Sequence, residues 1–298
     1  MNLFELTQYK RVSEKVLVEG GAMPGVGAIH IDEINPTLIP LEKELGIDLR
    51  NNVLGSVGKR EFSGDIDVAL KIDADKIPEF VERLKKSNQI HDIAKSSVIM
   101  TKVKIANYDE NREVTVGQNR TIERTGYVQI DFMPGDPDWL KTYYHSPHEK
   151  DSQYKGVYRN IMIASIAGNI NIEDSEEKIE DGRPLQSKRF MFSPRDGLVR
   201  VLRRPVPKKS GQGYTKKNNN KIIGGPWKTA DEIAKNLGLD NGEDLYSYET
   251  LVKAIKKNLT TEEQRKIFMA FTDNNTIRGM GIPPDIQEYS KDFEEDVK

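Results

Sequence analysis

Alternating apolar and polar positions predict strands along the first half of the chain. In 65-DIDVALKI-72 and 126-GYVQIDFM-133 an apolar residue recurs at every second position, which is the period of a strand with one buried face. Three further strands are predicted at 52-NVLGS-56, 97-SVIMTKVKIAN-107 and 112-REVTVGQ-118. These segments together predict a sheet within the N-terminal half.

Apolar residues at helical spacing predict two helices beside these strands. The first, 35-NPTLIPLEKEL-45, is expected to begin with Asn35 as its cap and Pro36 in its first position, and to stop at Gly46. The second covers 75-DKIPEFVERLKKS-87. The glycine-rich stretch 20-GGAMPGVGAIHI-31 lacks the Lys-Ser/Thr ending of a P-loop and is interpreted as a turn. This order of elements predicts a mixed sheet with helices packed on one face.

The second half of the chain shows fewer strand patterns and more helical ones. Strands are predicted at 189-RFMF-192 and 198-LVRVL-202, and 207-PKKSGQGYTKKNNNK-221 is interpreted as a mobile loop. Capping-box patterns at 229-TADE-232 and 260-TTEE-263 predict helices in the tail. We therefore expect an α+β protein in two parts, with the mixed sheet in residues 1–170 and a basic segment plus a mostly helical region in residues 171–298.

Composition excludes several classes of protein. Of the 298 residues, 36% are hydrophobic and 31% are charged, which is typical of a soluble globular protein. No cysteine occurs, so disulfides and thiolate metal sites are excluded. The N-terminus has no apolar core of signal-peptide length, and the longest apolar run, 161-IMIASIAG-168, is too short to span a bilayer. We expect a soluble, cytoplasmic protein.

The formal net charge of -2 conceals a strong segregation of charge. Residues 183–228 carry thirteen Lys or Arg and a single acid, Asp196, so this segment is +12 and the rest of the chain is -14. Such a segment favours a polyanionic partner, DNA or RNA, with Tyr214 and Trp227 available for stacking. The alternative is a solvated surface without a partner. The densest basic positions, and the candidate nucleic-acid contacts, are Arg200, Arg203, Arg204, Lys208 and Lys209.

Two aspartates in one strand are the strongest chemical signal in the sequence. Asp65 and Asp67 share one face of their predicted strand, about 6.5–7 Å apart along the chain, while Ile66 and Val68 share the other. Two carboxylates this close repel each other unless a cation lies between them. A pair of Mg²⁺ or Mn²⁺ ions bridged by carboxylates is the arrangement that in-line nucleotidyl transfer uses.

A third carboxylate on another strand strengthens this interpretation. Asp131 lies on the polar side of 127-YVQIDFM-133, so it is expected to complete the cluster from a neighbouring strand. The competing interpretations are solvent-facing acids on an edge strand for Asp65 and Asp67, and a turn cap before Pro134 for Asp131.

A small turn before the aspartate pair offers phosphate-binding groups. Gly55 lets the backbone approach a phosphate closely, and the Ser56 hydroxyl can bond its oxygens. Lys59 and Arg60 can neutralise the β- and γ-phosphates of a nucleoside triphosphate.

Taken together, 54-LGSVGKREFSGDIDVAL-70 resembles the signature of the DNA polymerase β-like nucleotidyltransferase superfamily. That signature has a hydrophobic residue, Gly and Ser, then a spacer, then Asp-hydrophobic-Asp-hydrophobic, and the version here is most similar to that of family X DNA polymerases. The resemblance implies a palm-like catalytic domain in which Ser56, with Lys59 or Arg60, binds the triphosphate. It also implies two metal ions bound by Asp65, Asp67 and Asp131, with Asp131 helping to deprotonate the attacking hydroxyl.

A second stretch, 143-YYHS-146 with 154-YKGVYRN-160, resembles the region where family X enzymes hold the incoming nucleotide. The resemblance implies that Tyr143 or Tyr144 lies beneath the sugar, and that Lys155 and Arg159 lie near the base. About fifty residues precede Gly55, too few for the lyase and helix-hairpin-helix domains of a repair polymerase. The Gly-Gly-x-x-Arg-Asp motif of CCA-adding enzymes is also missing, so the chain is more similar to the stand-alone, often phage-encoded, members.

The sequence therefore predicts a metal-dependent nucleotidyltransferase that adds a nucleoside monophosphate from an NTP or dNTP to a nucleic acid 3′-hydroxyl. Alternatives are transfer to a tRNA, a small molecule or a protein, and a non-catalytic nucleic-acid-binding protein on the same fold.

Overall fold

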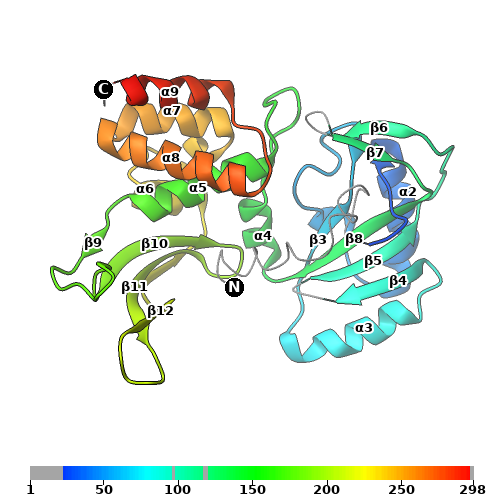
Figure 1. Cartoon of the computed structure of the whole chain (residues 1–298). Coiled ribbons are helices and arrows are strands. Elements are labelled where there is room, and N and C mark those ends of the chain that lie inside the picture. Colours follow the sequence, from blue (N-terminus) through cyan, green and yellow to red (C-terminus); the bar gives the residue numbers. More distant parts are fainter. Residues whose placement is uncertain (1–22, 96–97, 117–119, 296–298) are drawn as a thin grey trace. The chain divides into compact units, whose positions relative to one another are not determined.

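The computed structural model describes residues 23–95, 98–116 and 120–295 (Figure 1). The chain divides into two compact units, Met1–Gly156 and Val157–Lys298. The division falls before the boundary predicted at residue 170, so that almost all of α5 (Gly156–Asn169) groups with the C-terminal unit. Both units combine helices with sheets, as expected for an α+β protein.

The N-terminal unit is built on a mixed four-stranded sheet of order β3–β8–β5–β4. Strand β3 (Ile66–Leu70) runs parallel to β8 (Tyr127–Pro134), which pairs antiparallel with β5 (Ile99–Lys104). Strand β4 (Ile90–Lys95) closes the far edge, antiparallel to β5. The parallel pair at the opposite edge carries two of the three predicted acids.

Two helices cover one face of this sheet, namely α2 (Ile31–Leu45) and α3 (Ile77–Lys85) (Figure 1). The helices and the sheet share one apolar cluster, in which each fully buried aliphatic or aromatic side chain contributes roughly 1.5–3 kcal/mol. The cluster includes Ile34, Leu38, Leu41, Leu45, Ile66, Val68, Leu70, Phe80, Leu84, Ile99, Val103, Val128, Ile130 and Phe132. Because side chains alternate along a strand, the intervening residues of β3 and β8 face the other side of the sheet.

The start of α2 differs from the sequence prediction, which placed the cap at Asn35. The helix begins at Ile31, and the His30 N–H donates to the Glu33 carboxylate (2.9 Å) while His30 Nδ1 accepts from the Asp32 N–H (3.2 Å). Asn35 lies inside the helix, because the capping box at His30 satisfies the orphan N–H groups one turn earlier. The predicted stop is confirmed, since Gly46 has a left-handed φ of 61°.

Other boundaries in the N-terminal unit also differ. The stretch 52–56 was predicted as a strand, but it contains the end of a 3-10 helix (Arg50–Asn52), a single bridge from Val53 to Val68, and a turn. Strand β6 (Glu113–Val116) pairs with β7 (Arg120–Glu123), which was not predicted, in a separate two-stranded sheet. The short strands β1 (Ile29–His30) and β2 (Phe62–Ser63) pair antiparallel.

The C-terminal unit contains an antiparallel four-stranded sheet of order β12–β11–β10–β9. Its strands are β9 (Glu173–Asp174), β10 (Ser187–Ser193), β11 (Gly197–Pro207) and β12 (Tyr214–Trp227). The prediction of a mobile loop over residues 207–221 is wrong for most of its length, because β12 pairs along β11 and forms a long hairpin. The basic segment therefore forms most of this sheet, whereas the described residues after Trp227 are mostly helical.

In the C-terminal unit α5 precedes the sheet in sequence, and the other described helices follow it. Besides α5 they are α6 (Ala230–Asn236), the 3-10 helix Gly242–Leu245, α7 (Tyr248–Asn258), α8 (Thr261–Ile277) and α9 (Pro284–Glu295). Both predicted capping boxes are confirmed, at Thr229 with Glu232 and at Thr260 with Glu263. Within the parts of the chain that the structure describes, no helix is long and apolar enough to cross a membrane.

Candidate functional site

Asp67 and Asp131 lie side by side on the sheet face that α2 and α3 leave uncovered. The parallel pairing of β3 with β8 matches Ile66 to Ile130, Asp67 to Asp131 and Val68 to Phe132. Neighbouring strands are about 4.8 Å apart, so the two aspartates leave the sheet as direct neighbours. Both are half-buried. The third acid predicted from the sequence is therefore adjacent to the second one.

The environment of this pair disfavours two negative charges. Burial, followed by the charges of Asp65 and Asp131, raises the pKa of Asp67 well above its ordinary value. Burial, followed by the charge of Asp65, raises the pKa of Asp131 to about 7, against a smaller lowering effect of the hydrogen bond from Gln129. A cation bound between the carboxylates would remove this repulsion.

Asp65 lies directly before β3, and its charge acts on both other acids. The donors of this cluster are carboxylate oxygens, which are the ligands that Mg²⁺ and Mn²⁺ prefer. In the part of the chain that the structure describes, however, no three His, Cys, Asp or Glu side chains are arranged as a formed metal centre. The donor type and the mutual repulsion fit a divalent ion, whereas a complete ligand set is not assembled.

The Gly55-Ser56 turn lies beside Asp67. The Leu54 N–H donates to the Asp67 carbonyl (2.8 Å), which joins the start of the turn to β3. Gly55 has a φ of 69°, and a Cβ atom added there would lie 3.8 Å from Asp67 Oδ2. This left-handed conformation is costly for any other residue. The backbone of the turn and the acid cluster thus share one location.

Lys59 and Arg60 contact the segment that follows α4 (Pro137–Tyr143). Lys59 Nζ donates to the Ser146 carbonyl (2.7 Å), and burial lowers its pKa. Arg60 is 5% exposed, lies 3.2 Å from the Glu149 carboxylate and donates to the Ser152 carbonyl (3.4 Å). Because Arg60 is enclosed and ion-paired, Lys59 is the more accessible candidate for a triphosphate.

Tyr144 borders the acids, and Tyr143 packs on it. The two rings meet edge to face at 4.9 Å, and Tyr144 packs against the buried cluster formed by Leu54, Ala69 and Leu140. Burial, then the neighbouring Tyr143, then the charge of Asp67 raise the pKa of the Tyr144 phenol. Of the two tyrosines predicted near the sugar, the structure thus brings Tyr144 within electrostatic reach of Asp67.

The two remaining nucleotide-binding predictions differ in outcome. The Arg159 guanidinium is buried in the C-terminal unit, where it donates to the Leu245 carbonyl and to Asn160 Oδ1 (3.0 Å). These bonds give Arg159 a structural role and remove the basis for predicting that it contacts a base. Lys155 lies half-buried in the loop before α5, and its role stays a prediction.

Sequence reasoning missed Gln129, which contacts Asp131 directly. Gln129 Nε2 donates to Asp131 Oδ1 (2.8 Å), and Gln129 Oε1 accepts from the Met23 N–H (3.0 Å). The side chain is 2% exposed. The sequence alone places Gln129 on the same strand face as Asp131, since residues i and i+2 of a strand share a face, but it does not show that Met23 lies beside it.

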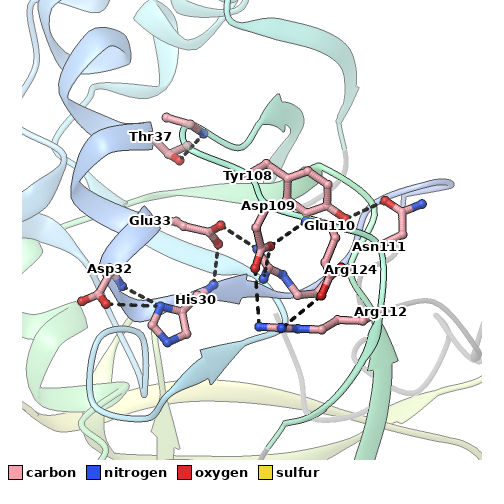
Figure 2. A network of polar contacts seen from close by, with 11 residues as sticks. His30, Asp32, Glu33, Thr37, Tyr108, Asp109, Glu110, Asn111, Arg112 and Arg124 are labelled. Carbon is pink, nitrogen blue, oxygen red and sulfur yellow. Dashed lines mark hydrogen bonds and ion pairs between the residues drawn. The ribbon is translucent and has the colours of Figure 1, made fainter.

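A network of ion pairs and hydrogen bonds surrounds the buried Arg124 (Figure 2). Arg124 is 1% exposed, and its Nη2 and Nη1 atoms lie 2.5 Å from Glu33 and 2.6 Å from Asp109. Its guanidinium also lies over the rings of Tyr108 (5.0 Å) and Phe62 (5.7 Å). Because Phe62 begins β2 (Phe62–Ser63), Arg124 contacts the strand that leads into Asp65.

Several basic side chains of residues 183–228 form ion pairs, although the composition of this segment predicts mostly unpaired positive charge. Glu173 in β9 pairs with Lys188 (2.7 Å) and Arg200 (2.6 Å), and Asp174 pairs with Arg189 (3.3 Å). Arg200 was predicted to contact nucleic acid, but this ion pair and its position over the Phe190 ring (4.9 Å) engage it structurally. The acids just outside the +12 segment therefore neutralise part of it.

The hairpin of β11 and β12 retains uncompensated charge. Burial, followed by the charge of Arg189, lowers the pKa of Arg203, whose Nε donates to Asn220 (3.3 Å). We define the basic hairpin as the Lys and Arg side chains of β11, β12 and their turn that form no ion pair with described residues. They are Arg203, Arg204, Lys208, Lys209, Lys216, Lys217 and Lys221.

Comparisons with known proteins do not indicate a family for this chain. No protein-family model matches the chain, and a search of curated proteins found no match.

Proposed function

We propose that this chain is a metal-dependent nucleotidyltransferase with a palm-like N-terminal domain. The observation that carries the proposal is the pairing of Asp67 with Asp131 on parallel strands, beside the Gly55-Ser56 turn. Each feature alone is common in proteins. Both features lie at the sheet face opposite α2 and α3. Phosphoryl transfer to a hydroxyl needs this combination, namely an acid cluster that binds cations and a backbone turn that binds phosphate.

Asp65, Asp67 and Asp131 would hold two Mg²⁺ or Mn²⁺ ions. Such ions supply charge neutralisation of the phosphates and activation of the attacking hydroxyl. The Gly55 backbone and the Ser56 hydroxyl would bind the triphosphate, with Lys59 as its basic contact in preference to the ion-paired Arg60. Tyr144 would line the site next to the nucleotide sugar.

In the proposed reaction, the acceptor hydroxyl oxygen attacks the α-phosphorus of the nucleoside triphosphate. The bond from this phosphorus to the bridging oxygen of the β-phosphate breaks, and pyrophosphate leaves. Asp131 Oδ1 is engaged by Gln129, so Oδ2 would accept the hydroxyl proton.

We propose a nucleic acid as the acceptor, because the basic hairpin concentrates positive charge that described acids do not neutralise. Small-molecule and protein acceptors provide no comparable reason for this charge. A tRNA is one form of the proposed acceptor class, and passive binding of nucleic acid without catalysis is the competing hypothesis.

The test is incubation with each labelled nucleoside triphosphate, Mg²⁺ or Mn²⁺, and in turn single-stranded DNA, single-stranded RNA, primed templates and tRNA. We expect label on one nucleic-acid acceptor, release of pyrophosphate, and loss of both with Asp67→Asn. Asp75→Asn, an exposed acid outside the cluster, serves as the control and should retain activity. Transfer at a near wild-type rate by Asp67→Asn would remove the catalytic assignment, and label only on a small molecule or protein would remove the proposed acceptor.

A further inference from the structure

We propose that Gln129 is a positioning residue whose amide fixes the orientation of the Asp131 carboxylate and couples it to the backbone at Met23. The orientation itself is a property of the fold, while its consequence for cation binding rests on the proposed function. Gln129 is separated from Asp131 by one residue of β8, so both side chains lie on the sheet face opposite α2 and α3.

The two hydrogen bonds of Gln129 allow only one orientation of its amide. The Met23 N–H is a donor and therefore needs the oxygen, Oε1, which places Nε2 at the Asp131 carboxylate. The flipped amide would set its NH₂ group against the Met23 N–H and its oxygen against Asp131 Oδ1, replacing two attractions with two repulsions. Because Gln129 is buried, water does not compete for either bond.

The Met23 end of this chain of contacts is itself held in place. The Gly27 N–H donates to the Tyr127 carbonyl (2.7 Å), and Thr125 Oγ1 donates to the Gly25 carbonyl (3.2 Å). A Cβ atom at Gly27 would lie 2.2 Å from the Glu123 carbonyl oxygen, so the backbone approaches this closely only because residue 27 is glycine. A fixed backbone donor thus fixes Gln129, which in turn fixes Asp131.

The positioning group is neutral, and this has a chemical consequence. The cation nearest in register, Lys102, is opposite Gln129 on β5, but its Nζ donates to the Pro24 carbonyl (3.1 Å) and lies over the Tyr127 ring (4.8 Å). An ammonium group bonded to Asp131 would neutralise the carboxylate. An amide orients it and leaves its negative charge available to a divalent ion.

The hydrogen bond from Gln129 to Asp131 Oδ1 determines which lone pairs of the Asp131 carboxylate stay available to a cation. The side-chain torsion of an unsupported aspartate is broad, so its carboxylate must be ordered when it binds a cation. With Oδ1 held by Gln129, Oδ2 and the second lone pair of Oδ1 are presented in a constant direction. Loss of a supporting hydrogen bond to a metal ligand typically costs about 10- to 100-fold in metal affinity.

The experiment compares Gln129→Met with Thr101→Val. Methionine keeps the volume of glutamine but removes both hydrogen bonds. Thr101→Val removes a buried hydrogen bond to the Ile130 carbonyl (3.0 Å) from the adjacent strand, on the face that packs against the helices. We expect calorimetric titration with Mn²⁺ to show about 10-fold weaker binding for Gln129→Met and unchanged binding for Thr101→Val. The kcat of transfer should fall, with little change in the KM for nucleoside triphosphate.

Equal Mn²⁺ affinity in Gln129→Met and wild type would overturn the inference, as would equal weakening in both variants, since that result indicates a general packing effect.

A readout without metal or activity separates this inference from the proposed function. In wild-type protein without metal, we expect the Gln129 side-chain amide protons to be shifted in the NMR spectrum and protected from exchange, and both effects to be lost in Asp131→Ala. An amide signal typical of exposed glutamine and insensitive to Asp131→Ala would overturn the positioning role, even where Gln129→Met fails to fold. If wild type binds no Mn²⁺ but shows the shifted amide, the proposed function fails and the positioning role stands.

Discussion

Asp67 and Asp131 are direct neighbours on parallel strands, and burial, followed by the negative charges of neighbouring acids, raises the pKa values of both. This arrangement costs stability whenever both carboxyls ionise without a bound cation. The acid cluster is therefore expected to lower the free energy of unfolding of the metal-free protein.

The first prediction is that the metal-free protein loses stability as the pH rises from about 4 to 7. The Asp131 carboxyl has a pKa near 3.9 when unfolded and about 7 when folded, so between these values the folded state binds the extra proton. Stability is then expected to fall with rising pH, by on the order of 4 kcal/mol for Asp131, and the raised pKa of Asp67 acts in the same direction. Urea unfolding in EDTA at pH 5, 6, 7 and 8 measures this.

Asp131→Asn is the control for that experiment, because it removes the titrating group and should flatten the pH dependence. Mg²⁺ at saturating concentration should restore stability at pH 8 in wild type and less so in Asp131→Asn. Wild-type stability that increases between pH 6 and pH 8, relative to the variant, would contradict the assignment of a raised pKa.

The second prediction concerns Gly55→Ala. Gly55 has a φ of 69°, so alanine should destabilise the fold by roughly 1–2 kcal/mol. The matched control is Gly46→Ala at the C-terminus of α2, where φ is 61° and nothing lies within 4 Å of the added Cβ. Both variants should lose similar stability, but only Gly55→Ala, whose methyl lies 3.8 Å from Asp67 Oδ2, should weaken nucleoside triphosphate binding in calorimetry. Equal nucleotide affinity in both variants would mean that the turn has only a structural role.

The third prediction is that Arg124→Met destabilises the protein by about 3–5 kcal/mol, because it leaves the buried Glu33 carboxylate without its counter-charge. Arg112→Met removes only exposed ion pairs to Asp109 and Glu110 and should cost less than about 1 kcal/mol. Denaturant unfolding of both variants gives the comparison. A loss of less than about 1 kcal/mol in Arg124→Met would show that the network in Figure 2 does not stabilise the fold around β2.

The fourth prediction concerns the basic hairpin. We expect nucleic-acid affinity to fall with a slope of about -3 to -5 in a plot of log affinity against log salt concentration. Reversing the charge of Arg203 and Arg204 should flatten this slope by about one to two units, and Lys216→Glu with Lys217→Glu should act similarly. Lys235→Glu with Lys253→Glu changes the net charge equally on exposed helical positions and is the control. Affinity independent of salt, or an equal effect of the control pair, would remove the hairpin from the proposed interface.

The sequence predicted most of the N-terminal sheet because its strands alternate strictly, as in Ile66, Val68 and Leu70 against Asp67. The same alternation placed Asp131 on the polar side of β8, and the strand pairing sets it beside Asp67. Local patterns failed where partners are distant. Tyr214–Trp227 contains lysines, asparagines and glycines that indicate a loop, yet pairing with β11 makes it a strand. The positioning role of Gln129 depends on its hydrogen bond from the Met23 N–H, and the sequence gives no sign that these distant residues are in contact.

The parallel register of β3 and β8 also protects the site against slippage. Moving β3 by one residue along β8 would turn Asp67 toward α2 and α3 and bring Ile66 and Val68 to the opposite face. That shift would bury a carboxylate among leucine and phenylalanine side chains and expose apolar surface at the same time. No intermediate spacing between the two acids is available, because backbone pairing changes only in whole residues. The positions from which Asp67 and Asp131 leave the sheet are therefore set by the apolar packing on the opposite side of the sheet.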